Sequence, residues 1–301
     1  MYYRSLNEEL REKFGEKLYK LALDGGFTCP NRDGTIGSRG CTFCLGGSGS
    51  FAEGQCASVS EQIERAKRRV EKKNPSGKYI AYFQSYTNTY APVKRLEALF
   101  GEAIAHPDIA ALSVGTRPDC LPPEVLELLA RLNKIKPVWV ELGLQTIHEQ
   151  TAEKIRRGYD LSVFDKAVKD CKAAGLYTVV HMIIGLPGET PEMAAQTADY
   201  IGKSGADGIK LQLLHVLRGT DMAEQYAAGE FEVMSMEEYI SALEECVRRL
   251  PPQMTIHRLT GDGDKKYLIA PLWSADKKRV LNAVNGAFRR DNVVQGEHHE
   301  V

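Results

Sequence analysis

Three cysteines within one short stretch carry the strongest chemical signal in this 301-residue chain. Cys29 is followed by Cys41 and Cys44, and the last two form a Cys-x-x-Cys pair that encloses Phe43. The residues between Cys29 and Cys41 include several Gly together with Pro, Asn and Asp, so this segment is expected to be a loop that wraps around a ligand. Clustered thiolates of this kind are typical metal ligands.

A fourth ligand for a tetrahedral zinc ion is difficult to find. No His occurs before His106, and Cys56 lies twelve residues beyond Cys44, at the start of an expected helix. Structural zinc normally takes four Cys or His ligands. Three thiolates without an obvious fourth favour an iron–sulfur cluster with one open iron, which can hold a small molecule such as a methionine moiety. A zinc site, or three unrelated buried cysteines, is the alternative.

Composition indicates a globular protein that works inside the cell. The chain is 43% hydrophobic and 26% charged with a formal net charge of -1, which neither predicts nor excludes nucleic-acid binding. No apolar run approaches the ~18 residues of a membrane span, and the first residues are polar and charged. We therefore expect a cytoplasmic protein with no membrane contact. Seven cysteines in such a chain favour metal or redox chemistry over a disulfide framework.

Short apolar segments rich in β-branched and aromatic residues alternate with helical patterns along most of the chain. The expected strands are 18–23, 79–83, 111–114, 138–142, 177–184 and 208–214, and the expected helices are 58–73, 93–105, 122–132, 146–157, 162–174 and 190–203. This alternation predicts parallel strands joined by right-handed crossovers. We expect an α/β fold, a partial (β/α)6 TIM-type barrel, with a doubly wound sheet as the alternative. Either places functional residues at the carboxyl ends of the strands.

The pattern changes after residue 220. A helix over 236–250, a short strand over 254–258 and a last helix over 277–290 are expected. The predicted organisation is an N-terminal segment (1–17), the partial barrel (18–220), a C-terminal α/β extension (221–294) and a mobile tail (295–301).

The cysteine loop resembles that of the radical S-adenosylmethionine (SAM) superfamily. That family places three cysteines after the first barrel strand, with an aromatic residue such as Phe43 between the last two. Eleven residues separate Cys29 from Cys41 where most members have three. This spacing and the Cys29-Pro-Asn-Arg-Asp-Gly-Thr sequence resemble a bacterial subfamily related to the Elongator catalytic subunit and to oxygen-independent coproporphyrinogen oxidase. The resemblance implies that a [4Fe–4S] cluster on Cys29, Cys41 and Cys44 cleaves SAM reductively to methionine and a 5′-deoxyadenosyl radical.

The resemblance also implies where SAM binds. Gln145 and Arg157 match residues that contact the ribose and the methionine carboxylate, roles that suit an amide and a guanidinium; Arg156 competes with Arg157 for the second. Gly185 would let the backbone approach the adenine. The remaining candidates for cofactor binding are Phe43, Gln84, Ser85, Arg117 and His181. Gln84 and Ser85 stand where relatives carry a Gly-Gly segment, and His181 is equally compatible with a core residue.

The resemblance to Elongator-type enzymes implies a tRNA substrate, with the C5 side chain of the wobble uridine as the target. Tyr86, His215 and Arg218 are the substrate-side candidates. A low-potential donor of the flavodoxin or ferredoxin type would supply the electron. Two alternatives stay open: a radical enzyme for a small metabolite or porphyrin precursor, and a non-catalytic module that binds zinc or a cluster.

Overall fold

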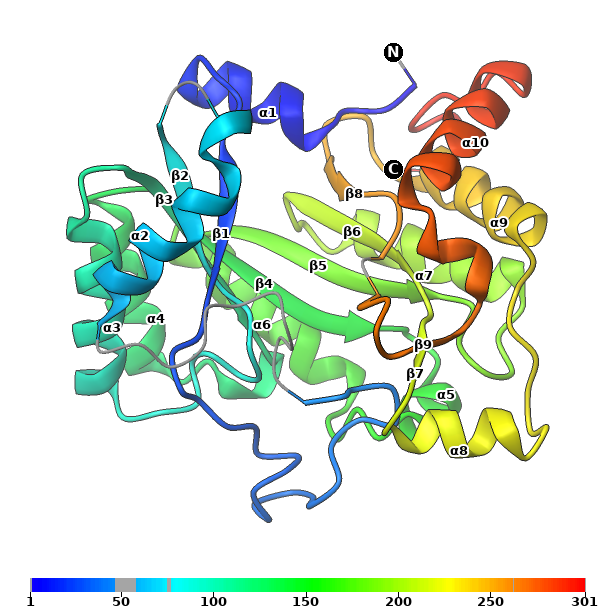
Figure 1. The fold of residues 1–301 in the computed structure, drawn as a ribbon, viewed down its shortest axis with the longest axis horizontal. Helices are drawn as coiled ribbons and strands as arrows, with labels where there is room; N and C mark the ends of the chain where they lie inside the picture. Colours follow the sequence, from blue (N-terminus) through cyan, green and yellow to red (C-terminus); the bar gives the residue numbers. More distant parts are fainter. Residues whose placement is uncertain (1, 47–57, 75–76, 262, 301) are drawn as a thin grey trace.

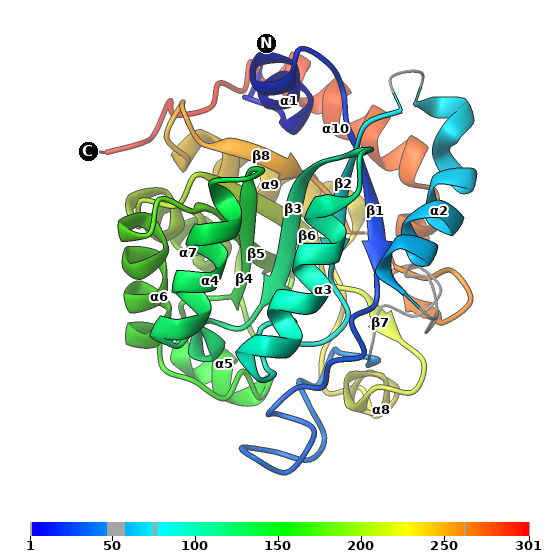
Figure 2. The same ribbon diagram turned by 90° about the vertical axis from the view of Figure 1, so that its left-hand side faces the viewer.

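A sheet of seven parallel strands forms the centre of the molecule. The computed structural model describes residues 2–46, 58–74, 77–261 and 263–300. The strands follow the order β1-β2-β3-β4-β5-β6-β8, and each neighbouring pair is parallel. The sheet curls into an incomplete barrel with helices along its outer side (Figures 1 and 2). The expected α/β partial barrel is therefore confirmed.

Strands and helices alternate as the sequence predicts. The sheet consists of β1 (Tyr19–Leu23), β2 (Tyr79–Phe83), β3 (Ile109–Thr116), β4 (Val138–Gln145), β5 (Tyr177–Ile184), β6 (Gly208–Leu213) and β8 (Thr255–Arg258). The helices between these strands are α2 (Val59–Val70), α3 (Val93–Ala105), α4 (Pro123–Asn133), α5 (Glu149–Lys154), α6 (Leu161–Ala173), α7 (Pro191–Lys203), α8 (Asp221–Ala227) and α9 (Met236–Arg249). Within the described residues, no helix combines the length and apolarity needed to cross a membrane.

Local sequence explains where these helices begin. The Ser58 hydroxyl accepts a hydrogen bond from the main-chain N–H of Glu61 and caps α2, and Thr190 caps α7 in the same way, with Pro191 at the first helical position. The strands are apolar because helices cover their outer face: all five residues of β2 are buried. The main core fills the space between the sheet and the outer helices.

Helix α1 (Leu6–Phe14) closes the amino end of the barrel. Its capping box joins Ser5 and Glu8, and Leu10 packs with Leu18, Ile80 and Trp139 in a small apolar cluster. Because this end is closed, ligands reach the barrel from the carboxyl ends of the strands or from its open side between β1 and β8.

The seventh strand of the sheet comes from the C-terminal part of the chain. β8 pairs with β6, whereas the sequence placed this strand in a separate extension. Helix α9 precedes β8 and packs against α7. This packing places β8 at the edge of the sheet. The extension also contains β9 (Leu268–Ala270), which pairs antiparallel with β7 (Val216–Leu217) from the end of the barrel segment, and α10 (Lys277–Arg290).

The final segment makes defined contacts with the body of the protein. The Gln295 side chain donates to the carbonyl oxygens of Pro251 and Met254, each at 2.8 Å, and accepts from the main-chain N–H of Arg4 at 2.8 Å. Gln295 is buried. These bonds connect residue 295, where the predicted tail begins, to both the start of the chain and the segment that follows α9.

Candidate active site

The three cysteines line one cavity at the carboxyl end of the barrel. They lie on the irregular loop that follows β1, which is folded by turns such as Arg32 N–H to Cys29 O at 2.8 Å and Cys44 N–H to Cys41 O at 3.0 Å. All three are free thiols of intermediate exposure. The cavity has a volume of about 210 Å³. Cys56 lies outside the described residues.

The thiols are electrostatically suited to a cationic ligand. Burial and the neighbouring Cys44 and Cys29 together raise the pKa of Cys41 to about 11, against the opposing effects of Arg117 and a hydrogen bond from Asn31. Three clustered thiols cannot all ionise at neutral pH without compensation. A bound metal centre supplies that compensation, because thiolates are the form that coordinates metals. The donor set therefore fits an iron–sulfur cluster.

Gln145 presents an unused acceptor to the same cavity. It ends β4 in a left-handed backbone conformation with φ of 71°. Its Oε1 atom is buried and has no hydrogen-bond partner within the described chain, although Gln145 lines the cavity. A buried polar atom without a partner is costly, so a ligand hydroxyl that donates to Oε1 would be favourable. A ribose hydroxyl is one group that could donate in this way.

Arg117 and Arg157 direct most of their donors at protein acceptors. Arg117 forms a bidentate pair with Asp119, at 2.9 and 2.8 Å, and donates to Arg157 O at 2.8 Å. Arg157, almost fully buried, pairs with both Glu149 oxygens at 3.0 Å and donates to the Thr146 carbonyl at 2.7 Å. Both line the cavity, yet in this structure they brace its wall. A carboxylate contact by Arg157 stays a prediction.

The remaining sequence-predicted residues divide into two groups. Phe43, Gln84, Tyr86 and His181 line the cavity together with the cysteines. Ser85, Gly185, His215 and Arg218 do not line it. His215 lies against Gly261 and Gly263, and the main-chain N–H of Arg218 donates to Tyr267 O at 2.7 Å. The segment that follows them returns to the cysteine loop, where the main-chain N–H of Met222 donates to Thr42 O at 3.0 Å. A substrate-side role for His215 and Arg218 stays a prediction.

A group of charged side chains inside the barrel was missed by sequence reasoning. This interior charge cluster comprises Lys20, Ser113, Glu141, His181 and Lys210. The fully buried Glu141 carboxylate pairs with both lysines and accepts from Ser113 Oγ at 2.6 Å and His181 Nε2 at 2.7 Å. The signal was present in the sequence, since Lys20, Glu141 and Lys210 each interrupt an otherwise apolar strand.

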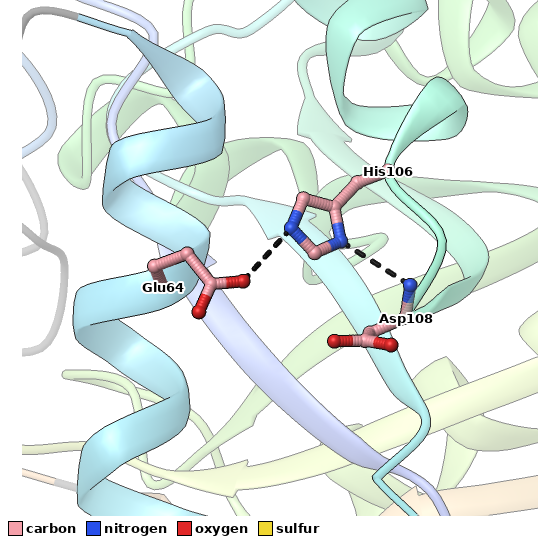
Figure 3. A group of neighbouring side chains, drawn as sticks. All are labelled: Glu64, His106 and Asp108. Carbon is pink, nitrogen blue, oxygen red and sulfur yellow. Dashed lines mark hydrogen bonds and ion pairs between the residues drawn. The ribbon is translucent and has the colours of Figure 1, made fainter.

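Another group of potential metal ligands lies on the outer surface, where α2 meets the turn between α3 and β3 (Figure 3). It is the only set of three His, Cys or acidic ligand atoms within 4.8 Å of one another in the described residues, and consists of Glu64, His106 and Asp108. Lys67 Nζ already pairs with Glu64 at 2.7 Å and with Asp108 at 2.6 Å. The Lys67 ammonium supplies the positive charge that a metal ion would otherwise provide. This group is therefore an ion-pair network that holds α2 against the turn before β3.

Related proteins share both the sequence and the fold. The chain is 44% identical to the uncharacterized protein YtqA of Bacillus subtilis over 98% of this chain and 92% of that protein. It is 30% identical to the tRNA uridine(34) acetyltransferase of Methanocaldococcus jannaschii, over 50% of this chain and 28% of that protein. The archaeal Methanocaldococcus infernus Elp3 superposes with a TM-score of 0.71 at 18% identity, covering 92% of this chain and 64% of that one.

Two family models match consecutive parts of the chain. The Radical SAM superfamily model matches residues 33–201, and the Radical_SAM C-terminal domain model matches residues 206–290. The first covers more than half of the chain and includes Cys41, Cys44 and strands β2 to β5. The chain therefore belongs to the radical SAM superfamily, whose members use a [4Fe–4S] cluster and S-adenosylmethionine.

Proposed function

We propose that this chain is a radical SAM enzyme that modifies the C5 side chain of the wobble uridine in tRNA. Cys29, Cys41 and Cys44 would hold the cluster, which supplies the electron that cleaves SAM to a 5′-deoxyadenosyl radical. The observation that carries the radical chemistry is the shared cavity in which the three thiols meet the unpartnered Gln145 Oε1. The enzyme would act in the cytoplasm with a flavodoxin- or ferredoxin-type donor.

The protein groups around the cavity have separable roles in this proposal. Gln145 would accept from a ribose hydroxyl, and Gln84 would contact the methionine part of SAM. Phe43 packs with the apolar cluster that includes Ile155 and Leu186, which shields one side of the cysteine pair from water. Tyr86 lines the cavity and is 41% exposed, so it stands at the entrance where a substrate base would arrive.

The proposal of a tRNA substrate is supported by sequence similarity to a protein named for tRNA. The Methanocaldococcus jannaschii relative is named for uridine 34 of tRNA, and its similarity spans half of this chain. Mass analysis of nucleosides from tRNA of a deletion strain tests the assignment. We expect one modified wobble uridine to be lost and its precursor to accumulate, with both reversed by the wild-type gene. An unchanged wobble-nucleoside profile would contradict the assignment and favour a small-molecule substrate.

A further inference from the structure

The interior charge cluster holds more positive than negative charge. Within the described parts of the chain, Glu141 is the only carboxylate within ion-pair distance of Lys20 or Lys210. His181 adds no charge at neutral pH, because burial, and then the ammonium of Lys210, lower its pKa to about 4. Lys20 and Lys210 therefore share one carboxylate, and the Arg258 guanidinium, whose charge lowers the pKa of both lysines, adds a further positive charge.

This excess charge is buried. The Lys210 side chain is 5% exposed and the Lys20 side chain 19% exposed. Burial, together with the positive charges of Lys20 and Arg258, lowers the pKa of Lys210 to about 7 against the attraction of Glu141. An ammonium without its own counterion in such surroundings is costly, so an incoming anion would be stabilised by it.

A cavity gives a ligand access to the two lysines. It has a volume of about 380 Å³ and lies at the open side of the barrel, where β1, α2 and β8 contribute to its wall. Lys20 and Lys210 line it. Tyr82 and Gln84 line both this cavity and the cysteine cavity, and Lys210 Nζ donates to Tyr82 Oη at 3.1 Å. A group bound at Lys210 is therefore only one side-chain layer from the cysteine cavity.

We propose that the interior charge cluster binds a carboxylate carried by the substrate, with Lys210 as its main partner and Lys20 as its second. The proposal rests on the proposed function and names the chemical class of the group next to the reacting atoms: the uridine side chain would end in a carboxylate. The depth of Lys210 suits the end of a side chain better than a phosphodiester, which continues on both sides.

The anion site is tested first without any nucleoside. Thermal unfolding of the reconstituted full chain is compared in sodium acetate and sodium chloride at equal ionic strength. We expect acetate to raise the unfolding temperature of the wild type above its value in chloride, and to have no such effect on Lys210→Met. That variant retains the Lys20–Glu141 pair, so it should fold. Lys166→Met, whose side chain is 76% exposed, is the control and should retain the acetate effect. An acetate effect that is absent, or is unchanged in Lys210→Met, overturns the proposal.

The carboxylate assignment is tested with a matched pair of nucleosides. We expect 5-carboxymethyluridine to bind the wild type about tenfold more tightly than its neutral analogue 5-carbamoylmethyluridine, the effect of one charge-assisted hydrogen bond, and Lys210→Met to abolish this preference. If Lys210 instead governs the binding of uridine 5′-monophosphate, the carboxylate assignment is wrong. If acetate protects through Lys210 but neither nucleoside binds, the anion site stands and the uridine substrate of the proposed function fails.

Discussion

The side chain of Asn31 donates a hydrogen bond to the main-chain carbonyl oxygen of Arg156 at 2.6 Å. The same amide nitrogen lies 3.6 Å from Cys41 Sγ, and the Arg156 carbonyl oxygen lies 3.5 Å from that sulfur. Arg156 has a left-handed backbone conformation, with φ of 57°. One amide therefore joins the loop after β1 to the end of α5 and also provides an N–H donor to a proposed cluster ligand.

This geometry predicts that Asn31 tunes the cluster. Hydrogen bonds to the sulfur atoms of an iron–sulfur cluster raise its reduction potential, because they stabilise the more negative, reduced state. Asn31→Leu should lower the potential by about 40 mV, the one-electron equivalent of about 1 kcal/mol. Potentiometric titration followed by electron paramagnetic resonance measures this. Asn282→Leu, on the exposed side of α10, should have the wild-type potential; equal shifts in both variants would refute the role.

Glu141 should be essential for stability. Glu141→Gln leaves two buried ammonium groups without a carboxylate, a change that typically costs about 3–5 kcal/mol. In the wild type, burial alone would raise the pKa of the Glu141 carboxyl. The ammonium groups of Lys20 and Lys210, with the hydrogen bond from His181, outweigh burial and hold this pKa well below its usual range. The stabilisation is therefore present above the unfolded-state pKa near 4.3 and is lost as pH falls toward the folded-state pKa.

Urea unfolding at neutral and acid pH measures the effect of Glu141→Gln. The difference in unfolding free energy from the wild type should be large at pH 7 and smaller in acid. Glu127→Gln, on the exposed side of α4, is the matched control and should stay close to the wild type. A Glu141→Gln protein as stable as this control would show that the Glu141 carboxylate does not stabilise the interior charge cluster.

His181 should make the protein less stable as pH falls. Burial holds its folded-state pKa at about 4, below the usual value of about 6.5, so between these values the unfolded chain binds the extra proton. Stability should fall through this window by about 3 kcal/mol more in the wild type than in His181→Gln, which keeps a donor for Glu141. Unfolding free energies measured from pH 7 to pH 4 test this. Parallel pH profiles for the two proteins would contradict it.

Gln145 should contribute to SAM affinity and little to stability. Gln145→Met removes the buried Oε1 atom that lacks a protein partner, so the ligand-free protein should be as stable as the wild type or more stable by about 1 kcal/mol. The dissociation constant for SAM should rise about tenfold. Anaerobic equilibrium dialysis measures the affinity, with the exposed Gln150→Met as control. Unchanged SAM affinity would remove Gln145 from the binding site.

Sequence reasoning was most successful where the signal was local. The cysteine loop and the apolar strands were visible because each depends on neighbouring residues, and Gln145 was proposed from the resemblance to the radical SAM family. The pairing of Lys20 with Glu141 was not visible, because it joins β1 to β4 across the curled sheet. The antiparallel pairing of β7 with β9 was not visible either, because it joins segments far apart in the chain. The joining of β8 to the sheet likewise depends on how α9 lies against α7.

The central claim is that Cys29, Cys41 and Cys44 hold a cluster that cleaves SAM. The most direct measurement is 5′-deoxyadenosine release after anaerobic reconstitution with iron and sulfide and reduction in the presence of SAM. The wild type and Cys171→Ala, which removes a buried core thiol, should both bind iron and release 5′-deoxyadenosine. Each single Ala variant of the three loop cysteines should lose both properties. Product formation that survives these substitutions, or a wild type that retains zinc and releases no 5′-deoxyadenosine, would contradict the claim.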